Sequence, residues 1–449
     1  MTPVGQADNG HGVTWWSLVC FACLMATSAT AQTFDPQQAV AYALAHNPGL
    51  RAQGAMAAAS RERIAAARSM ARPKLVAGVS YGLSDDPLAG LTDLLETRSV
   101  TTGSFSPPLL DNPGTRHLST TSIALTFPLY AGGGINAGIE AARERAAWHH
   151  DELKREREQV AAQTLIAYYG VEAAMQGMRT AKAAVSAARR HVRTTRRLLQ
   201  EARIVRSDWL TAQVNLAALQ GFAAKVRAAA ASAKSELRLA MGLPSGVPLT
   251  LAPASLPSLP AATRPLVRRA LRDRPDLKGV VRQWRAARAQ VTIARATMRP
   301  HIGISAANQW YGSAPGFANR SWTVMATVHE ALYDGGAASA RASAASERMQ
   351  ALAFERRALA ARIRSEVHQA IVTMRTAALR LALARRRVER ARRAALLVRR
   401  RYGEGRTVLL DLLQSEQNLT KARIARERAR YALLRGDTLL KLAEGKPLP

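Results

Sequence analysis

Cysteine is almost absent from this chain of 449 residues, because the only two, Cys20 and Cys23, lie among the first 31 residues. The remaining sequence therefore excludes disulfides and cysteine-ligated metals. Acidic residues are scarce as well, with 32 Asp and Glu against 64 Lys and Arg and a formal net charge of +32. A charge of this size favours a nucleic acid or an anionic membrane surface as partner, unless the compartment of the protein excludes it.

The first residues predict export from the cytoplasm. Residues 13–29 form an apolar run of signal-peptide length, and Ala29-Thr30-Ala31 is a small-x-small cleavage site. The segment before Trp15 has no Lys or Arg, which departs from the usual basic start and leaves a start site placed too far upstream as the alternative. We interpret residues 1–31 as a signal peptide. The residues before Cys20 do not suit lipidation, so no lipid anchor is expected.

Long hydrophobic runs are missing after residue 31. No stretch of about 18 apolar residues occurs there, which excludes a transmembrane helix. An exported chain without such a helix is soluble beyond the inner membrane or crosses a membrane as strands.

The sequence contains two copies of one unit. Positions in the first part of each copy align at an offset of 227 residues and later positions at an offset of 203, so one insertion of 24 residues lies between Leu83 and Ser119. Agreement over most of the chain predicts a tandem duplication. We predict repeats at 32–247 and 266–449, joined by a Pro-rich linker at 248–265. The aligned positions include Pro48 with Pro275, Pro73 with Pro300, Gly132 with Gly335, Asn215 with Asn418 and Gly242 with Gly445.

The sequence of each repeat predicts one helix, two strands and two further helices. The helical segments are rich in Ala, Arg, Leu and Glu, with apolar residues at spacings of three and four and almost no Gly or Pro. The middle helix of each copy, with roughly 65 residues, would span about 100 Å, a length that needs a coiled-coil-like neighbour. The predicted helices are 36–71, 137–202 and 206–241 in the first copy and 264–298, 338–402 and 406–443 in the second.

Four segments alternate large apolar residues with small or polar ones, which predicts β-strands. Each has the roughly nine to eleven residues that cross a bilayer at a tilt. A small soluble antiparallel sheet with one wet face is the alternative. Four strands do not close a membrane barrel, and open edges are not tolerated in lipid. The membrane interpretation therefore requires several protomers to combine their strands in one barrel. The predicted strands are 73–83, 120–130, 300–311 and 320–330.

Several phrases, in their order, spacing and duplication, resemble the TolC-like outer-membrane efflux and secretion proteins over almost the whole chain after residue 31. The resemblance implies a mainly α-helical homotrimer, in which the four strands of each protomer form a twelve-stranded β-barrel above a long periplasmic α-helical barrel. It also implies that the protein lies in the cell outer membrane and contacts its lipid. Its implied partners are a periplasmic adaptor protein and an inner-membrane ABC or RND-type transporter. The phrases are Ala39–Pro48, Met70–Pro73, Phe127–Gly133, Met298–Pro300 and Tyr402–Glu416.

The same resemblance places two helical-hairpin turns at the periplasmic tip, where an adaptor would bind. Because Gly405 aligns with Ala202, the two turns are expected to differ in sharpness. The loops 83–119 and 312–319 would face the exterior. The expected adaptor-facing residues are Arg203, Arg206, Ser207, Asp208, Gly403, Gly405, Arg406 and Thr407.

Helix ends near this tip are often acidic in the family, whereas here they are basic. We hypothesise a positive entrance that favours anionic cargo or an acidic partner tip, because low-dielectric walls focus the field of clustered charge. The alternative is the ordinary solvated face of long Arg-rich helices. The entrance residues are Arg385, Arg386, Arg392, Arg393, Arg399 and Arg400.

No motif predicts catalysis or a cofactor. The segment 78–82 matches G-x-S-x-G, but Ser80 lies within an alternating strand rather than at a strand-to-helix turn. His149 and His150 are adjacent on a helix, so their side chains diverge by about 100° and do not easily ligate one ion. His329 lacks the second histidine of a zincin helix. We therefore expect neither an enzyme nor a cofactor.

The expected function is an exit duct of a tripartite export system that passes an unfolded protein toxin or other cargo to the exterior, as in type I secretion. Drug or solute efflux with a proton-driven pump is the alternative. A periplasmic coiled coil that binds polyanions is a remote alternative, since it explains the charge and the helices but neither the strands nor the duplication. Nucleic acid is not an expected partner.

Overall fold

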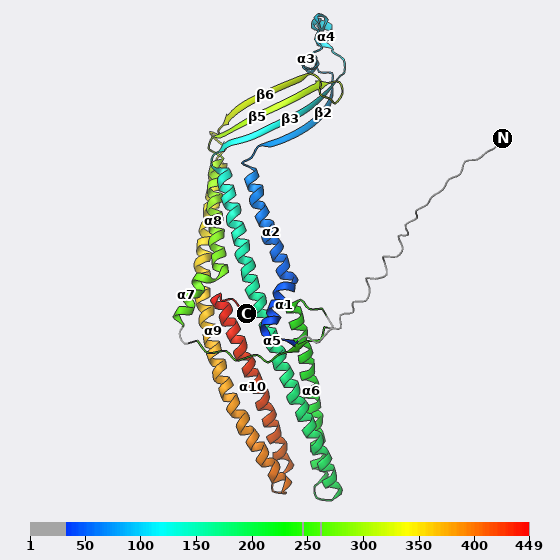
Figure 1. Ribbon diagram of the computed structural model, residues 1–449, viewed down its shortest axis with the longest axis vertical. Coiled ribbons are helices and arrows are strands. Elements are labelled where there is room, and N and C mark those ends of the chain that lie inside the picture. Colours follow the sequence, from blue (N-terminus) through cyan, green and yellow to red (C-terminus); the bar gives the residue numbers. More distant parts are fainter. Residues whose placement is uncertain (1–32, 245–246, 261–262, 449) are drawn as a thin grey trace, which may run out of the picture.

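The computed structural model describes residues 33–244, 247–260 and 263–448, so the predicted signal peptide at 1–31 lies outside the described residues. The molecule is elongated, with a curved β-sheet near one end and two helical hairpins at the other (Figure 1). Among the described residues, no helix combines the length and the apolar character needed to cross a membrane.

Helices make up most of both copies. The first copy contains β1 (Thr33–Phe34), α1 (Pro36–His46), α2 (Pro48–Ser69), β2 (Lys74–Ser84), α3 (Pro87–Glu96), η1 (Thr102–Phe105), α4 (Pro107–Asp111), β3 (Arg116–Ala131), α5 (Gly134–Gln200) and α6 (Arg206–Met241). After β4 (Thr250–Leu251), the second copy contains α7 (Arg264–Asp273), α8 (Pro275–Ala296), β5 (His301–Gly312), β6 (Arg320–His329), α9 (Ala337–Gly403) and α10 (Leu409–Glu444).

Four strands form one antiparallel sheet in the order β2-β3-β5-β6. Leu75 lies opposite Leu125, which lies opposite Ala306, which lies opposite Val324. Residues directly opposite share a face, so the alternation in the sequence gives the sheet one apolar face and one face of small or polar residues. The apolar face carries Leu75, Val79, Tyr81 and Leu83 of β2, Ile123, Leu125 and Phe127 of β3, Ile302, Ile304 and Trp310 of β5, and Trp322, Val324 and Val328 of β6.

The longest strand, β3, exceeds its predicted range of 120–130. It begins at Arg116, because it continues to pair with β2 as far as Ser84. Between Pro128 and Tyr130 its register with β5 shifts by one residue. Proline has no N–H for the ladder, which is why it is tolerated at such a bulge.

Two helices of 67 residues each, α5 and α9, run the length of the helical part. Each pairs with a shorter helix, α5 with α6 and α9 with α10 (Figure 1). Buried residues recur at spacings of three and four, as in Ile363, Val367, Ile371 and Met374 of α9, which is the pattern of a coiled-coil seam. A Cβ at Gly436 of α10 would lie 3.3 Å from the Met374 Cα. The glycine therefore lets α10 approach α9 closely.

The prediction of one unbroken helix at the start of each copy is wrong, because both helices break before a proline. Asn47 separates α1 from α2, and Arg274 separates α7 from α8. Pro48 and Pro275 have no N–H for the hydrogen bond to the residue four positions back, and their rings clash with the preceding turn. Each proline therefore begins a new helix.

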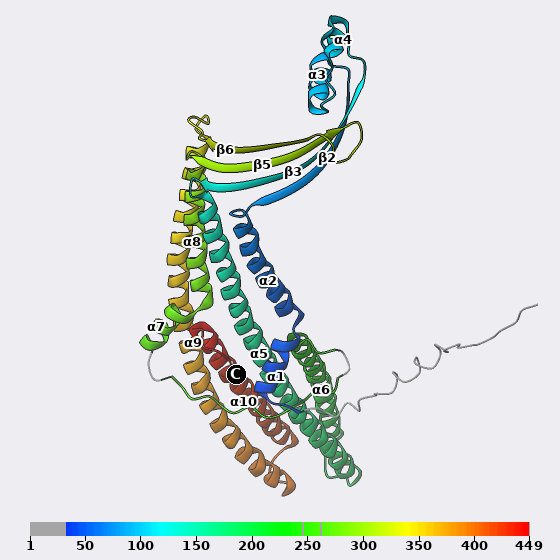
Figure 2. The same cartoon turned by 45° about the horizontal axis from the view of Figure 1, so that its top comes forward.

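The segment between β2 and β3, predicted as a loop at 83–119, contains three short helices. Asp86 caps α3, and its carboxylate accepts a hydrogen bond from the Ala89 N–H at 2.8 Å. Arg98 donates to the carbonyl oxygen of Arg320 at 2.9 Å, which ties the segment to the start of β6. Figure 2 shows α3 and α4 beyond the ends of the strands.

The linker packs back onto the long helices. β1 pairs in parallel with β4, and the fully buried Tyr168 of α5 lies beneath them, its hydroxyl 2.8 Å from the Phe34 carbonyl oxygen and 2.6 Å from that of Ala252. Burial raises the pKa of Tyr168 well above its usual value, and the nearby charge of Glu172 adds to the effect. The hydroxyl therefore stays protonated and can donate.

Candidate functional site

The two predicted hairpin turns lie at the same end of the molecule, opposite the sheet (Figure 1). Residues 201–205 join α5 to α6, and residues 404–408 join α9 to α10. The structure therefore gathers all eight predicted tip residues at one end, four in or beside each turn.

Both turns close with the same backbone hydrogen bond. The N–H of Arg203 donates to Leu198 O, and the N–H of Arg406 makes the equivalent bond, both at 2.8 Å. Ala202 at φ +55° and Gly405 at φ +71° both adopt the left-handed conformation that ends a helix in a Schellman motif. The expected difference in sharpness is therefore wrong. The left-handed conformation costs conformational free energy at Ala202, whereas Gly405 adopts it without that cost.

The outer surface of the tips carries both arginines and carboxylates. The guanidinium of Arg203 lies 3.7 Å from the Glu201 carboxylate, and that of Arg406 lies 3.5 Å from Glu404. All four side chains are exposed, so these pairs contribute little to stability. They leave the arginines free to meet a partner.

The first turns of α6 and α10 each carry a carboxylate, Asp208 and Asp411, at equivalent positions. The positive end of the helix dipole favours negative charge there. The Thr407 hydroxyl donates to the Asp411 carboxylate at 2.7 Å, while Arg206 and Ser207 are exposed. Two fixed acids therefore lie among the tip arginines.

A small apolar cluster joins the two hairpins near their tips. Ala212 of α6 packs with Leu409, Leu412 and Leu413 of α10, and these four side chains are at most 5% exposed. Tyr402 of α9 covers the cluster. The two tips are thus parts of one packed unit rather than separate arms.

A polar cluster that sequence reasoning does not reveal joins the hairpins further from the turns. Arg399 of α9 pairs with Glu416 of α10, with its Nε 3.2 Å from the carboxylate. Gln417 of α10 donates to the side chain of Asn215 in α6 at 3.0 Å. Asn215 is one of the positions aligned between the repeats, and Glu416 ends one of the phrases that resemble the family. The sequence alone does not show that α10 faces α5 and α6.

His191 of α5 belongs to the same cluster. It lines a small cavity of about 20 Å³ together with Glu416. Burial lowers the pKa of His191, and the charges of Arg399 and Arg190 lower it further, whereas Glu416 opposes the shift. A neutral imidazole therefore occupies the contact between the hairpins at neutral pH.

The six predicted entrance arginines form two parallel rows along α9. Heptad positions recur on one side of a coiled-coil helix, and all six are exposed. Arg385 lies about 27 Å from the end of α9, because a helix rises about 1.5 Å per residue. Of the six, only Arg399 has a carboxylate within 4.0 Å in the described part of the chain. The rows are Arg385, Arg392 and Arg399, and Arg386, Arg393 and Arg400.

Cations dominate the tip half of both hairpins. Residues 179–234 and 375–428 contain 28 Lys and Arg but only 7 Asp and Glu. A groove of about 610 Å³ between α6, α9 and α10 shows the pattern locally, because an apolar floor lies between cations. The cations are Arg380, Arg387, Lys421 and Arg428, and the floor includes Phe222, Leu383 and Ile424.

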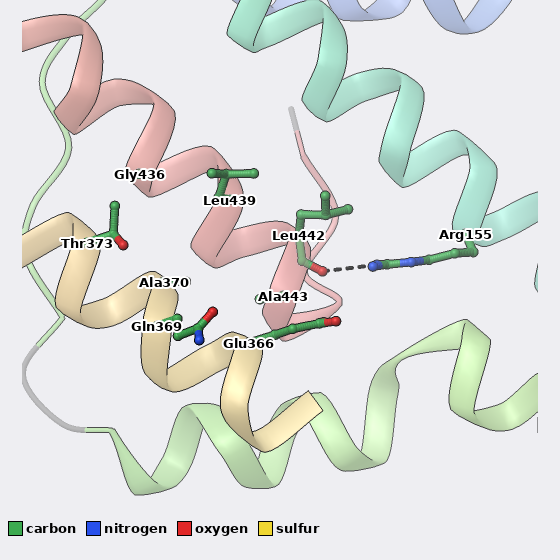
Figure 3. Close-up of a pocket in the computed structure, with 9 residues that line it drawn as sticks. All are labelled: Arg155, Glu366, Gln369, Ala370, Thr373, Gly436, Leu439, Leu442 and Ala443. Carbon is green, nitrogen blue, oxygen red and sulfur yellow. Dashed lines mark hydrogen bonds between the residues drawn. The ribbon is translucent and has the colours of Figure 1, made fainter. Parts of the chain in front are cut away.

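A second hollow, of about 380 Å³, lies between α5, α9 and α10 at the opposite end of the hairpins (Figure 3). Arg155 of α5 donates across it to the carbonyl oxygen of Leu442 at 3.0 Å. Beside it, the buried Arg274 donates to the carboxylates of Glu366 and Asp276, each at 2.6 Å. These bonds fix α8 to α9 and α10, so we assign this hollow to a structural joint.

Potential metal ligands are scattered. His149 lies 3.2 Å from the Glu152 carboxylate, and the buried Asp151 lies 4.0 Å from Arg282. Within 33–244, 247–260 and 263–448, His, Cys, Asp and Glu side chains do not gather in groups of three or more that could hold a metal ion. Ser80 lies in the middle of β2.

A two-faced sheet above long paired helices, repeated within one chain, is the arrangement of a known family. The sequence matches the outer membrane efflux protein family over residues 39–243 and 266–445. The chain belongs to this family. The predicted outer-membrane location of this chain is thereby confirmed, and the family is one of channel proteins.

A curated relative and two solved structures resemble this chain. Protein CyaE of Bordetella pertussis is 29% identical over 323 residues, which cover 70% of this chain and 63% of CyaE, less than two thirds of its length. The CmeC outer membrane channel of Campylobacter jejuni has a TM-score of 0.79 at 15% identity, covering 91% of this chain and 85% of CmeC. VceC of Vibrio cholerae has a TM-score of 0.75 at 18% identity, covering 92% and 96%. These structures confirm the predicted TolC-like fold.

Proposed function

We propose that this protein forms the exit duct of a tripartite export system. Three protomers combine their strands into one outer-membrane β-barrel and their helices into one periplasmic tunnel. The observation that carries the proposal is a sheet with one apolar face and two edge strands that are exposed along almost their whole length. Open edges are not stable in lipid, and closure by further copies removes them.

A periplasmic adaptor protein binds at the tips in this proposal. The exposed arginines Arg203, Arg206 and Arg406 offer charge-assisted hydrogen bonds to an acidic partner surface. Replacing Arg203 and Arg406 with Glu is expected to abolish export while the trimer still forms, because neither side chain packs within the chain. Export assays and unheated gels of the same cells measure both properties. Unchanged export by the double variant would remove these arginines from the adaptor contact.

The charge of the hairpins supports an anionic cargo. The two rows of exposed arginines along α9, together with 28 Lys and Arg against only 7 Asp and Glu in the tip half of the hairpins, create a positive field that low-dielectric walls focus. An unfolded acidic polypeptide presents carboxylates repeatedly along such a path. The cargo we propose is therefore an unfolded protein, supplied by an inner-membrane ABC transporter, as in type I secretion.

Drug or solute efflux with an RND-type transporter is the second candidate. The description of the matched family as efflux proteins favours it. Deleting the gene separates the two: loss of a secreted acidic protein supports secretion, whereas increased sensitivity to small toxic molecules with normal secretion supports efflux.

The duct itself is tested by outer-membrane fractionation followed by cross-linking and unheated gel electrophoresis. A heat-modifiable trimer in the outer-membrane fraction is expected. A soluble monomer that binds polyanions in a salt-sensitive manner would overturn the proposal and support the coiled-coil alternative.

Single-channel recording tests the positive entrance. The purified channel is expected to prefer anions, and the double variant Arg385→Glu, Arg392→Glu is expected to weaken that preference, because the charge of each protomer then falls by four. The matched control, with Lys at both positions, keeps the charge and is expected to keep the preference. Cation selectivity of the unchanged protein would show that the arginines are an ordinary solvated face.

A further inference from the structure

The apolar face of the sheet has a sharp border at the end that joins the helices. Leu75 is the first residue of β2 on that face, and Ile302 is the first of β5. From Leu75 to Leu83 the face extends about 27 Å along the strand. In the proposed duct, on which this inference rests, the apolar face lies against lipid. The residues just before Leu75 and Ile302 then lie at the surface of the apolar layer.

Basic residues gather at this border. Three of them precede the first strand of each repeat at matching positions, because the offset of 227 converts one set into the other. Arg341, in the second turn of α9, lies near the same border, since α8 and α9 pack against each other. Figure 1 shows α2, α5 and α8 meeting the sheet at this end. The two sets are Arg68, Arg72 and Lys74, and Arg295, Arg299 and His301.

The six Lys and Arg of this border, which we call the basic belt, are all exposed. In the described part of the chain, none of them has a carboxylate within 4.0 Å. Asp334 is the acid at the start of α9, and its carboxylate accepts hydrogen bonds from the N–H groups of Gly336 and Ala338 at 3.1 and 2.7 Å. The belt consists of Arg68, Arg72, Lys74, Arg295, Arg299 and Arg341.

The ends of the helices account for only part of the belt. Arg68 and Arg295 lie in the last turns of α2 and α8, where the negative end of the helix dipole favours a cation. Arg72 and Lys74 lie beyond the end of α2, and Arg341 lies near the start of α9, where the dipole does not favour a cation. Helix capping therefore does not explain the basic character of the whole border.

The opposite end of the sheet has the reverse charge. Residues 84–116 and 312–320, which connect the strands there, contain five Asp and Glu and three Arg. The four junctions between strands and helices contain six Lys and Arg and three Asp and Glu. An even spread of arginine over the chain would give both ends the same sign, so the asymmetry distinguishes the helical end. The four junctions are 68–74, 131–141, 295–301 and 330–341.

The belt lies at the depth of lipid headgroups. The headgroup layer is about 5–7 Å thick on each side of an apolar core of about 30 Å. Lys74 adjoins Leu75, and Arg72 lies within about 10 Å of Leu75 along the chain. Long basic side chains also extend along a membrane until their charge reaches the headgroups. The phosphates of the adjacent leaflet are therefore within reach of the belt.

We infer that the basic belt binds anionic phospholipids in the leaflet nearest the helices. The guanidinium group donates two parallel hydrogen bonds to a phosphate, and each Lys or Arg beside an anionic lipid surface strengthens binding about fivefold. A zwitterionic headgroup also carries a phosphate, but its own cation opposes the field of the belt. The belt therefore selects lipids by net charge and fixes the depth of the sheet in the membrane.

Spin-labelled lipids in reconstituted vesicles measure this selectivity. The full protein is inserted into phosphatidylcholine vesicles that contain a trace of spin-labelled phosphatidylglycerol or spin-labelled phosphatidylcholine. The motionally restricted fraction of each label reports how strongly that lipid binds to the protein. The unchanged protein is expected to prefer phosphatidylglycerol about fivefold. Equal fractions for the two labels would overturn the inference.

A variant with Gln at four positions of the belt is expected to lose most of this preference. In the described residues these four side chains make no hydrogen bonds, so the fold is retained. A matched control removes the same charge from exposed positions of α9 that lie about 29 Å or more from its start, beyond the screening length of about 10 Å at 0.1 M salt. Retained preference in the first variant, or an equal loss in the control, would overturn the assignment to the belt. The variant changes Arg68, Arg72, Lys74 and Arg295, and the control changes Arg356, Arg362, Arg364 and Arg375.

Insertion and lipid preference are measured in the same sample. A trimer that inserts into the vesicles without a lipid preference would refute the inference and leave the proposed duct. A protein that remains a soluble monomer beside the vesicles would refute both. Sedimentation with isolated cell-wall polymer tests a competing partner that bears carboxylates. Binding of the unchanged protein but not of the Gln variant to that polymer, together with equal fractions for the two lipid labels, would assign the belt to the cell wall instead.

Discussion

Arg274→Met removes the hydrogen-bonding centre that holds the break between α7 and α8. The Arg274 side chain is 2% exposed and bonds to Asp276 and Glu366, each at 2.6 Å, and to the carbonyl oxygen of Ala443 at 3.4 Å. Methionine is unbranched and fills much of the same space. The variant therefore leaves two carboxylates without their cation, and the helix junction is expected to open more often.

The magnitude follows from the exposure of the partners. Removing one member of a buried ion pair costs about 3–5 kcal/mol. Asp276 and Glu366 are 24% and 40% exposed, so water replaces part of the lost bonding and the expected cost is about 2–3 kcal/mol. The equivalent Asn47 bonds to Ala240 O at 3.1 Å and caps α2, and Asn47→Ala is expected to cost about 1–2 kcal/mol.

Hydrogen–deuterium exchange measures this local opening directly. Exchange in peptides covering 264–280 is expected to accelerate about 30- to 150-fold in Arg274→Met, since about 1.4 kcal/mol corresponds to a factor of ten. Asn47→Ala is expected to accelerate exchange in 36–55 by a smaller factor. Unchanged exchange at 264–280 in Arg274→Met would refute the reasoning.

The same joint predicts a dependence on pH. Burial raises the pKa of Asp276, but hydrogen bonds from Arg274 and the charges of Arg274 and Arg155 hold it below its usual value. A carboxylate with a lowered pKa stabilises the folded joint above the unfolded value of about 3.9, and the stabilisation is lost as the pH falls further.

Two further predictions concern the hairpins. The pKa of His191 is lowered, mainly by burial, so protonation below about pH 6.5 destabilises the folded contact. Protection of the tip amides, measured relative to their intrinsic exchange rates at each pH, is expected to fall as the pH is lowered from 7.5 to 5.5, and His191→Gln is expected to remove this dependence. Gly405→Ala is expected to destabilise its turn by about 1 kcal/mol, and Ala202→Gly to stabilise the other by less, because Ala202 already bears the cost of positive φ. Limited proteolysis at the two turns compares them, and equal cleavage in both variants would contradict this account.

The sequence predicts much of the fold because its signals are periodic and repeated. Alternation in 75–83 fixes which face of β2 is apolar, and the constant offset of 203 places Gly335 where Gly132 lies. Spacing alone also locates the two turns. Local patterns of this kind survive without knowledge of the neighbours.

The remaining features depend on contacts between distant segments. Asn47 and Arg274 both precede a proline, but Ala-rich and Arg-rich residues on either side conceal the break. The cluster of His191, Arg399 and Glu416 joins three helices that are far apart in sequence. Asp86 and Pro87 are a recognisable helix start, but the inserted segment has no counterpart in the second copy for comparison.

The two repeats keep glycine at Gly132 and Gly335, where φ is positive, but at other equivalent positions they meet one structural need with different residues. Asn47 and Arg274 differ completely, yet both donate to the equivalent carbonyl oxygens of Ala240 and Ala443, because the helix end there needs a donor of any kind. In the hairpins, equivalent positions of the two repeats can even differ in the sign of their charge. Glu172 pairs with Arg430, whereas their equivalents, Arg375 and Arg227, are both cations. The duplication has therefore constrained the sheet and left the hairpins free to acquire the positive charge on which the choice of cargo and partner depends in our proposal.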